Sequence, residues 1–372
     1  MKYSIFKFKH MTKTIFFHAL TAFTALFLTG CDDDFKKSAF ETYGEGIYII
    51  NEGAFGQNNG SISFYDIDND TVINNIFEAA NNNRPIGDVV QSFTLVNGNT
   101  GYIVVNGSSK IEIVNASTFT TITDPIVVKY PRYFTKVDAD KGYISAGSMQ
   151  GFIYIVDLQS NSVTDSIKVG YGPEVMLKKN NSVFVVNSGG WSVDSTISII
   201  NTVTDEVSDT IITGKVPVDM AFDASGYLWV ICKGYALYDW NPPYNLIEET
   251  DALLMKIDTE TRQVIWQDII GSAGDFIFSY PKLSVSADGE TIFCLLPDGV
   301  YKLSAELPAL PSSAFISGTF YGLEVNPSDD NIFVFESSFT GAGKMVIYND
   351  EGSEIKNFTV GIAPNGAVFN LY

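Results

Sequence analysis

Prolines that precede apolar, strand-like segments recur along this chain at nearly even intervals. They stand at Pro85, Pro131, Pro173, Pro217, Pro281 and Pro364. The intervals are 46, 42, 44, 64 and 83 residues. The longest equals two units of about 41, with the missing landmark near residues 318–321, and the interval of 64 is one unit that carries an insertion of roughly twenty residues. Such a chain folds as repeated copies of one supersecondary unit.

A second landmark, an apolar residue followed by a polar turn, occurs seven times. It is found at Tyr65-Asp66, Val114-Asn115, Val156-Asp157, Ile200-Asn201, Ile257-Asp258, Leu303-Ser304 and Tyr348-Asn349. Between the landmarks, short β-rich runs alternate with Gly, Asn and Asp clusters, and helical periodicity never lasts longer than a turn or two. The spacing of the landmark prolines, with four strands per repeating unit, is typical of a β-propeller. We predict an all-β, seven-bladed β-propeller with four antiparallel strands per blade.

The first unit lacks its innermost strand. It begins at Ile47 with a segment that corresponds to the second strand of the other units, and the last residues, 363–372, form a spare strand. Pairing of this C-terminal strand with blade one would close the ring and leave no open sheet edge there. The propeller is therefore expected to span residues 47–372.

The N-terminal residues have the layout of a bacterial lipoprotein signal peptide. Four lysines precede an apolar stretch at 15–28, which ends in the sequence LTGC at 28–31. This stretch is short for a membrane-spanning helix. We predict a signal peptide at 1–30 and lipidation of Cys31, the alternative being a secreted protein with a cysteine near its cleavage site.

Residues 31–46 are expected to comprise the lipidated cysteine, an acidic run and a linker. The run Asp32–Asp34 follows Cys31 directly. It is either a solvated tether or resembles the acidic signal that, in some Gram-negative groups, exports a lipoprotein to the outer leaflet. We therefore expect a lipid-anchored protein of the outer membrane that faces the cell exterior.

Charge and composition exclude several kinds of site. The net charge of −20 disfavours nucleic acid as a partner. Both histidines, His10 and His18, lie in the predicted signal peptide, so the mature chain would have no imidazole for a catalytic triad, a general base or a metal site. Cys232 and Cys294 lie within strand-like runs, where a free buried thiol is the expected state.

One segment imitates a calcium-binding loop. Asp66, Asp68 and Asp70 have the spacing that opens an EF-hand, but Thr71 stands where a glycine is required and Phe77 where a bidentate glutamate is required. A hairpin turn between the third and fourth strands of a blade explains the aspartates without calcium. We expect no bound metal and no required cofactor. A carboxylate pair acting as a lyase or glycosidase remains an alternative, although no motif points to it.

Aromatic residues gather at one end of the predicted ring. This connector face carries the links between blades and the loops between second and third strands, whereas the turn face carries the other two sets of turns. The aromatic residues assigned to the connector face are Phe55, Tyr130, Tyr171, Trp191, Tyr235, Tyr238, Trp240, Tyr244, Phe276, Phe278, Tyr280, Phe320, Tyr321 and Phe339. Exposed aromatic side chains in such numbers mark a binding surface, although any one of them could instead pack inward.

The candidate ligand-binding residues combine these rings with hydrogen-bonding groups. They are Phe55, Asn58, Asn59, Arg84, Tyr130, Arg132, Tyr171, Trp191, Tyr238, Trp240, Tyr244, Phe278 and Tyr321. Arg84 and Arg132 flank prolines at the same end of the ring, where they either donate to a ligand or pair with local carboxylates.

Three features together resemble a family of seven-bladed propeller surface lipoproteins. They are the sequence IYIINEGAFGQNNGSISFYDID at 47–68, the lipidation sequence with its acidic run, and repeats of the kind P-x-x-M-x-x-D-x-x-G-x-L-W-V at 217–230. The resemblance covers essentially the whole predicted mature chain. Its best-studied members resemble lipoproteins that capture cobalamin and pass it to a TonB-dependent outer-membrane transporter.

Two kinds of function follow. The resemblance implies a non-enzymatic protein that binds a corrinoid on the connector face and delivers it to a transporter. The alternatives are a surface propeller that binds or cleaves glycans, or one that binds another protein.

Overall fold

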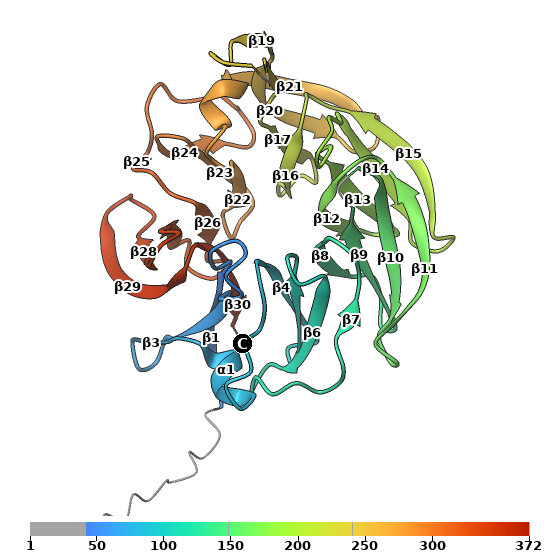
Figure 1. Ribbon diagram of the computed structural model, residues 1–372. Coiled ribbons are helices and arrows are strands. Elements are labelled where there is room, and N and C mark those ends of the chain that lie inside the picture. The colour runs from blue at the N-terminus through green and yellow to red at the C-terminus, as the bar shows by residue number, and fades with distance from the viewer. Residues whose placement is uncertain (1–41, 148, 240, 372) are drawn as a thin grey trace, which may run out of the picture. The chain divides into compact units, whose positions relative to one another are not determined.

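A computed structural model describes residues 42–147, 149–239 and 241–371, and Cys31 with the predicted signal peptide lies outside this range. The described residues form seven four-stranded antiparallel sheets arranged as blades around a central axis (Figure 1). The predicted seven-bladed propeller is confirmed. Blade 1 combines β1–β3 with β30, and blades 2–7 follow in chain order from β4 to β29.

Each blade contributes one strand to each of four concentric positions. The innermost strands are β30 (Pro364–Asn370), β4 (Val90–Val96), β8 (Pro131–Lys136), β12 (Pro173–Lys179), β16 (Pro217–Phe222), β22 (Lys282–Val285) and β26 (Gly322–Val325). The second strands are β1 (Gly46–Asn51), β5 (Thr100–Val105), β9 (Lys141–Ala146), β13 (Ser182–Asn187), β17 (Leu228–Cys232), β23 (Thr291–Leu296) and β27 (Ile332–Glu336).

The outer half of each blade is built in the same way. The third strands are β2 (Ser61–Asp66), β6 (Lys110–Asn115), β10 (Gly151–Asp157), β14 (Thr196–Asn201), β20 (Asp251–Asp258), β24 (Gly299–Ser304) and β28 (Ala342–Tyr348). The outermost strands are β3 (Thr71–Ile73), β7 (Ile126–Val127), β11 (Ser162–Val169), β15 (Glu206–Ile212), β21 (Gln263–Ser272), β25 (Ile316–Ser317) and β29 (Glu354–Ile362).

The core lies between the blades. Second strands such as β5 and β17 are apolar at nearly every position because a neighbouring blade covers each face, whereas the outermost β11 is mostly exposed. In the described part of the chain, the buried apolar residues form seven clusters, one between each pair of adjacent blades. The free thiols Cys232 and Cys294 lie in these clusters, as expected from their sequence context.

The ring closes through the C-terminal strand. β30 pairs antiparallel with β1 from Gly46↔Asn370 to Asn51↔Pro364, which confirms the predicted closure. Each innermost strand also contacts the innermost strands of both neighbouring blades. The packed region begins before the predicted residue 47, since Tyr43 is 4% exposed and packs against Phe64 and Phe119 in the core between blades 1 and 2.

Three short elements interrupt the repeat. Helix α1 (Ile76–Ala80) links β3 to β4 and buries Ile76 and Phe77. The insertion in blade 5 contains a hairpin of β18 (Ala236–Tyr238) and β19 (Leu246–Glu249), and the 3-10 helix η1 (Ala273–Phe276) follows β21. Among the described residues, no helix has the length and hydrophobicity of a membrane-spanning segment.

The aspartates that imitate a calcium loop form the hairpin between β2 and β3. Asp66 accepts a hydrogen bond from the backbone N–H of Asn69 at 2.9 Å. Asp70 accepts hydrogen bonds from the Tyr65 hydroxyl at 2.8 Å and from Lys356 Nζ at 2.7 Å. The side chains at both ends of the segment thus hold a turn, as the hairpin interpretation predicts.

Candidate functional site

A β-bulge at the start of the innermost strand turns an extra side chain toward the central channel in five blades. In blade 3, Pro131 is paired with Ala146 and Tyr133 with Ser145, so Arg132 has no opposite residue. The corresponding extra residues in the other four blades are Gln91, Glu174 with Val175, Val218 and Asn365. A bulge changes the direction of a side chain relative to the regular alternation of a strand.

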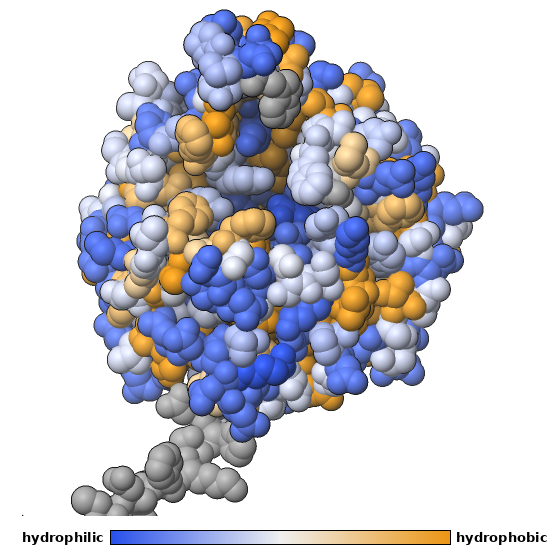
Figure 2. All heavy atoms as spheres, viewed as in Figure 1, coloured by the Kyte–Doolittle hydropathy of each residue, from blue (hydrophilic) through white to orange (hydrophobic). Residues whose placement is uncertain are grey.

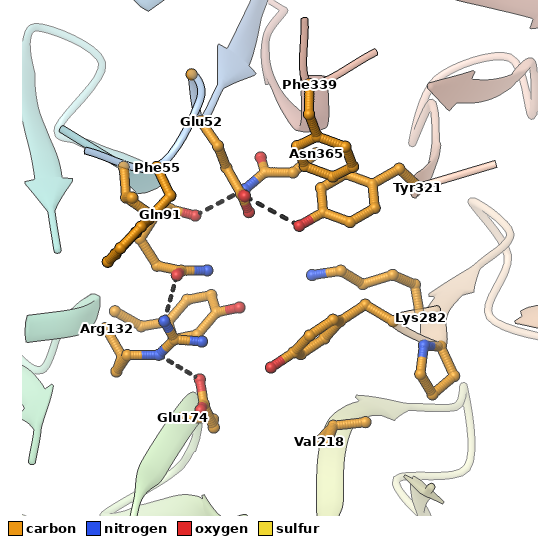
Figure 3. Close-up of a pocket in the computed structure, with 15 residues that line it drawn as sticks. Glu52, Phe55, Gln91, Arg132, Glu174, Val218, Lys282, Tyr321, Phe339 and Asn365 are labelled. Atoms are coloured by element: carbon orange, nitrogen blue, oxygen red, sulfur yellow. Dashed lines mark hydrogen bonds and ion pairs between the residues drawn. The ribbon is translucent and has the colours of Figure 1, made fainter. Parts of the chain in front are cut away.

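These side chains surround the mouth of the channel on the connector face. The mouth residues are Gln91, Arg132, Glu174, Val218, Lys282 and Asn365. They line a pocket of about 210 Å³ (Figure 3). Lys282 opens β22 directly after Pro281, at the place in blade 6 that the bulged residues occupy elsewhere. The pocket therefore has walls from different blades, and only the closed ring assembles it.

A wider pocket of about 860 Å³ adjoins the mouth. It shares Phe55, Arg132, Glu174, Val218 and Tyr280 with the smaller pocket. Its remaining aromatic lining residues are Tyr130, Trp191, Tyr235 and Tyr238. We call the two pockets together the funnel, and Figure 2 shows this hollowed face with both apolar and polar residues around the depression. Its size lies in the range of sites for organic ligands.

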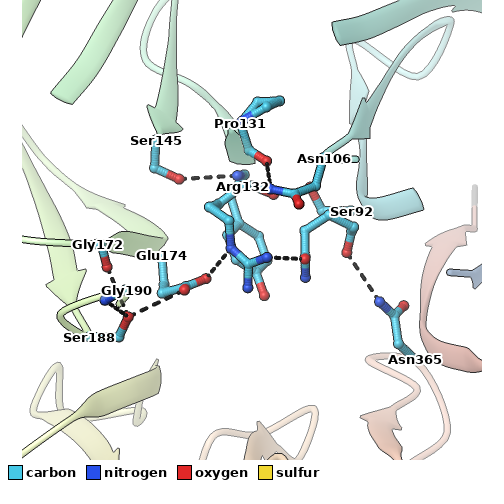
Figure 4. A network of polar contacts seen from close by, with 12 residues as sticks. Ser92, Asn106, Pro131, Arg132, Ser145, Gly172, Glu174, Ser188, Gly190 and Asn365 are labelled. Atoms are coloured by element: carbon cyan, nitrogen blue, oxygen red, sulfur yellow. Dashed lines mark hydrogen bonds and ion pairs between the residues drawn. The ribbon is translucent and has the colours of Figure 1, made fainter. Parts of the chain in front are cut away.

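Hydrogen bonds and one ion pair tie several mouth residues together. Arg132 Nε lies 2.8 Å from Glu174 Oε2 (Figure 4), and its Nη1 donates to the Gln91 side chain (Figure 3). Glu174 also accepts a hydrogen bond from the Ser188 hydroxyl at 3.3 Å. The charge of Arg132 is thus balanced within the protein, which is the local pairing considered for this residue from the sequence.

The same network continues into blades 1 and 7. Asn365 Nδ2 donates to the backbone carbonyl of Gln91 at 3.2 Å and to Glu52 Oε1 at 2.8 Å. The Tyr321 hydroxyl donates to Glu52 Oε2 at 2.9 Å. An arc of polar contacts therefore joins blades 7, 1, 2, 3 and 4 around the mouth. The mouth residues of blades 5 and 6, Val218 and Lys282, take no part in this arc.

Acidic side chains lie near Lys282 in the channel. Asp219 accepts hydrogen bonds from the backbone N–H groups of Met220 and Leu283, both at 2.9 Å. Burial raises the pKa of Glu324 to about 8, with Lys282 opposing this shift and Asp219 adding to it. Burial alone would lower the pKa of Lys282, but Tyr133, Asp219, Glu324 and Glu52 together hold it above its usual range.

The structure brings six of the predicted ligand-binding residues to the funnel. They are Phe55, Tyr130, Arg132, Trp191, Tyr238 and Tyr321. Phe55 and Trp191 are 84% and 76% exposed, which is unusual for side chains of this size. The Trp191 and Tyr130 rings lie 5.9 Å apart. The prediction that aromatic residues gather on the connector face is realised in these rings.

Arg84, predicted to bind ligand, is held away from the funnel by a carboxylate. Its guanidinium forms two hydrogen bonds with Glu112, at 2.6 and 3.0 Å, and the Glu112 side chain is fully buried. Asn59 and Asn58, also predicted to bind ligand, stabilise the loop that carries Phe55. Asn59 Oδ1 accepts a hydrogen bond from the Ala54 backbone at 2.8 Å, and the Asn58 N–H donates to Asp88 at 3.4 Å.

The remaining predicted residues divide into three groups. Tyr171, Tyr244 and Phe278 are exposed, but they are not lining residues of the funnel. Phe276 and Phe320 pack inward in the cores around blade 6, as the alternative interpretation allowed. Trp240 lies outside the described residues.

The candidate residues predicted from the sequence do not include most of the polar residues that line the smaller pocket. These are Glu52, Gln91, Glu174, Lys282 and Asn365, together with Tyr133. A usable signal was present for three of them, because Glu174, Lys282 and Asn365 each follow one of the landmark prolines directly, as Arg132 does. In blades 1, 3, 4, 5 and 6 the residue after the landmark proline lines the pocket, whereas in blade 2 the lining residue is Gln91 and the residue after Pro85, Ile86, is buried in the core.

The propeller as a whole matches one known protein family. A family model described as "Domain of unknown function (DUF5074)" matches residues 45–370, from one residue before β1 to the last residue of β30. The chain belongs to the DUF5074 family. No curated protein is similar enough to this DUF5074 member to count as a match.

Solved structures similar to this DUF5074 protein share its fold at low sequence identity. A quinoprotein alcohol dehydrogenase-like protein from Bacteroides thetaiotaomicron is 15% identical, with a TM-score of 0.61 over 88% of this chain and 79% of that chain. A functionally unknown protein from Desulfotomaculum acetoxidans is 12% identical, with a TM-score of 0.58 over 88% and 99%. Hydrazine synthase from Kuenenia stuttgartiensis is 15% identical, with a TM-score of 0.54 over 74% and 88%. At these identities the likeness shows the fold alone.

Proposed function

We propose that this protein is a non-enzymatic receptor that binds a corrinoid such as cobalamin in the funnel. The observation that carries the proposal is the composition of this one site, in which exposed aromatic walls surround a floor of amide and charged groups. A corrinoid has a broad, partly apolar ring rimmed by carboxamides. Such a ligand needs flat apolar area together with hydrogen-bond donors and acceptors, and the funnel offers both.

Capture in this site would rely on shape, stacking and hydrogen bonds. The sequence from residue 42 onward contains no histidine, so imidazole ligation of the cobalt is not part of the proposal. The ligand would be released unchanged, because a receptor binds without turnover. Its acceptor would be a TonB-dependent outer-membrane transporter.

The location proposed for this receptor is the outer membrane, with the propeller held outside the cell by lipid on Cys31. Two acyl chains bind a protein stably to a membrane, whereas a single acyl chain gives only marginal membrane binding. The Cys31→Ala variant should therefore leave the membrane fraction while its propeller remains folded. Retention of this variant in the membrane fraction would contradict the anchor.

A desalting experiment with cyanocobalamin tests the ligand assignment. The purified propeller is incubated with the vitamin, passed through a gel-filtration column and examined by its visible spectrum. We expect the red chromophore to elute with the protein, with its amount saturating at one equivalent. Elution of all the cobalamin with small molecules would contradict the proposal, and saccharide binding by the same protein would favour the glycan-binding alternative.

A further inference from the structure

Lys282 differs from the other charged residues of the mouth, because its ammonium group forms no ion pair or hydrogen bond with another residue in the described part of the chain. Among the described residues, no hydrogen-bond acceptor or carboxylate lies within bonding distance of its Nζ. Arg132, by contrast, is paired with Glu174 at 2.8 Å. Figure 3 shows the Lys282 side chain extending into the open pocket, opposite the labelled Arg132 and Gln91, with no interaction drawn to it.

A partly buried ammonium group needs acceptors for its three N–H donors. Water can supply them in the empty pocket, but a ligand that displaces this water must replace those hydrogen bonds. Gln91 Nε2 adds a second donor without a partner among the described residues, because only the Oε1 of this side chain is engaged, by Arg132. The pocket therefore holds donors aimed at an oxygen atom of a ligand.

Acceptors in the same pocket complete the pattern. Glu52 receives one hydrogen bond on each oxygen, from Asn365 and from Tyr321, so each oxygen keeps a free lone pair. Asp219 and Glu324 lie near Lys282 as well. A negatively charged ligand group would approach Lys282 against the repulsion of Glu52 and Asp219, whereas a neutral carbonyl oxygen would not.

We propose that the pocket at the channel mouth is a carboxamide subsite, in which Lys282 and Gln91 donate to the amide oxygen and Glu52 accepts from the amide N–H₂. The inference rests on the proposed corrinoid function and specifies which part of the ligand enters the mouth. The macrocycle would then lie over the aromatic walls of the wider pocket. Lys282 becomes the residue that selects amide-rimmed ligands.

Calorimetry with cyanocobalamin on matched lysine variants tests the donor. Lys282→Met removes the N–H donors and keeps the chain length, so Kd should rise about tenfold or more, as for loss of a charged hydrogen bond. Lys282→Arg keeps the donors and should stay within about threefold of the parent. The control is the variant Lys344→Met. Lys344 is an exposed lysine of β28 that lies 3.8 Å from Glu336, and its replacement should leave Kd unchanged.

A chemical comparison on the parent protein needs no variant. Cyanocobalamin derivatives in which one carboxamide is hydrolysed to a carboxylate are titrated one by one. At least one of them should bind more weakly than cyanocobalamin, because its new charge would face Glu52 and Asp219. Equal binding of all derivatives, or tighter binding of one that Lys282→Met abolishes, would overturn the carboxamide assignment.

Cyanocobalamin binding by the parent and by Lys282→Met distinguishes a failure of the carboxamide subsite from a failure of the proposed corrinoid function. If the parent binds cyanocobalamin and Lys282→Met binds it equally well, the subsite is overturned and the corrinoid function stands. If the folded parent binds no cyanocobalamin, both are overturned.

Discussion

The Asp223 carboxylate is buried on the turn face together with a lysine. Its Oδ2 lies 3.1 Å from Lys256 Nζ and 3.0 Å from the Trp229 indole nitrogen. Lys256 also donates to the Ala305 carbonyl of blade 6 at 2.6 Å, so this group links two blades. The pair thus contributes to the interface between blades 5 and 6 and lies on the face opposite the funnel.

Replacing Asp223 by alanine should destabilise the fold strongly. The substitution leaves the Lys256 ammonium buried without its counter-charge, which costs about 3 kcal/mol or more. Urea denaturation measures the change in the free energy of unfolding. The control is Asp124→Ala, an exposed aspartate, which should change this free energy by less than about 0.5 kcal/mol. Equal effects of the two substitutions would show that the buried pair is not stabilising.

Glu324 should make the stability of the propeller depend on pH. Burial raises its pKa from the ordinary 4.5 to about 8 in the folded chain, so between these values the folded state holds a proton that the unfolded state has released. Stability attributable to this group therefore falls as pH rises from about 4.5 to about 8. Asp219, whose pKa is also raised by burial, acts in the same direction.

The Glu324→Gln variant tests this dependence. Glutamine stays neutral, so its melting temperature should fall less between pH 5 and pH 8 than that of the parent. The two proteins should differ least at pH 5, where Glu324 is protonated in the folded parent. If the melting temperatures of parent and variant changed by the same amount between pH 5 and pH 8, Glu324 would be ionised in the folded protein already at pH 5.

At the level of strands, the repeat could be predicted but the bulges could not. Blade 7 lacks a landmark proline, yet spacing alone placed its innermost strand near residues 318–321, and β26 begins at Gly322. A strand alternates its side chains with a period of two, and a bulge shifts that alternation by one residue. The period of two does not reveal this shift by itself, and the prolines before Glu174 and Asn365 mark it only once the structure shows that the residue after each proline lies in a bulge.

The partner of Arg84 could not be named from the sequence for a related reason. Chain position placed it beside a proline on the connector face, but its partner Glu112 lies on β6, 28 residues away. Only the fold, in which the segment between α1 and β4 lies beside β6, brings these two side chains together.

The strand β30 carries the closure of the ring. Deleting residues 364–372 would expose the edge of β1 and remove Ala367 from the core between blades 7 and 1. We expect the truncated protein to lose its cooperative thermal transition, since one missing contact surface opens the whole ring. A melting transition equal to that of the full chain would contradict this account of closure.

At the scale of the whole molecule, the site is a product of the closed ring. The mouth residues come from six blades, and the polar arc around them reaches from Tyr321 in blade 7 to Glu174 in blade 4. Seven separate interblade cores hold these strands at a fixed radius. The connector loops differ from blade to blade, and they supply aromatic walls of the funnel such as Phe55 and Trp191.

The most direct test of this account is a calorimetric titration of cyanocobalamin into the parent and three alanine variants. Trp191→Ala and Tyr280→Ala remove walls of the funnel, whereas Leu307→Ala removes an exposed apolar side chain from the connection after β24, on the turn face. We predict that the parent binds one equivalent, that each funnel variant raises Kd about tenfold or more, and that Leu307→Ala stays within about twofold of the parent. Absence of binding by the parent, or equal losses from both faces, would contradict the assignment of the funnel as a corrinoid site.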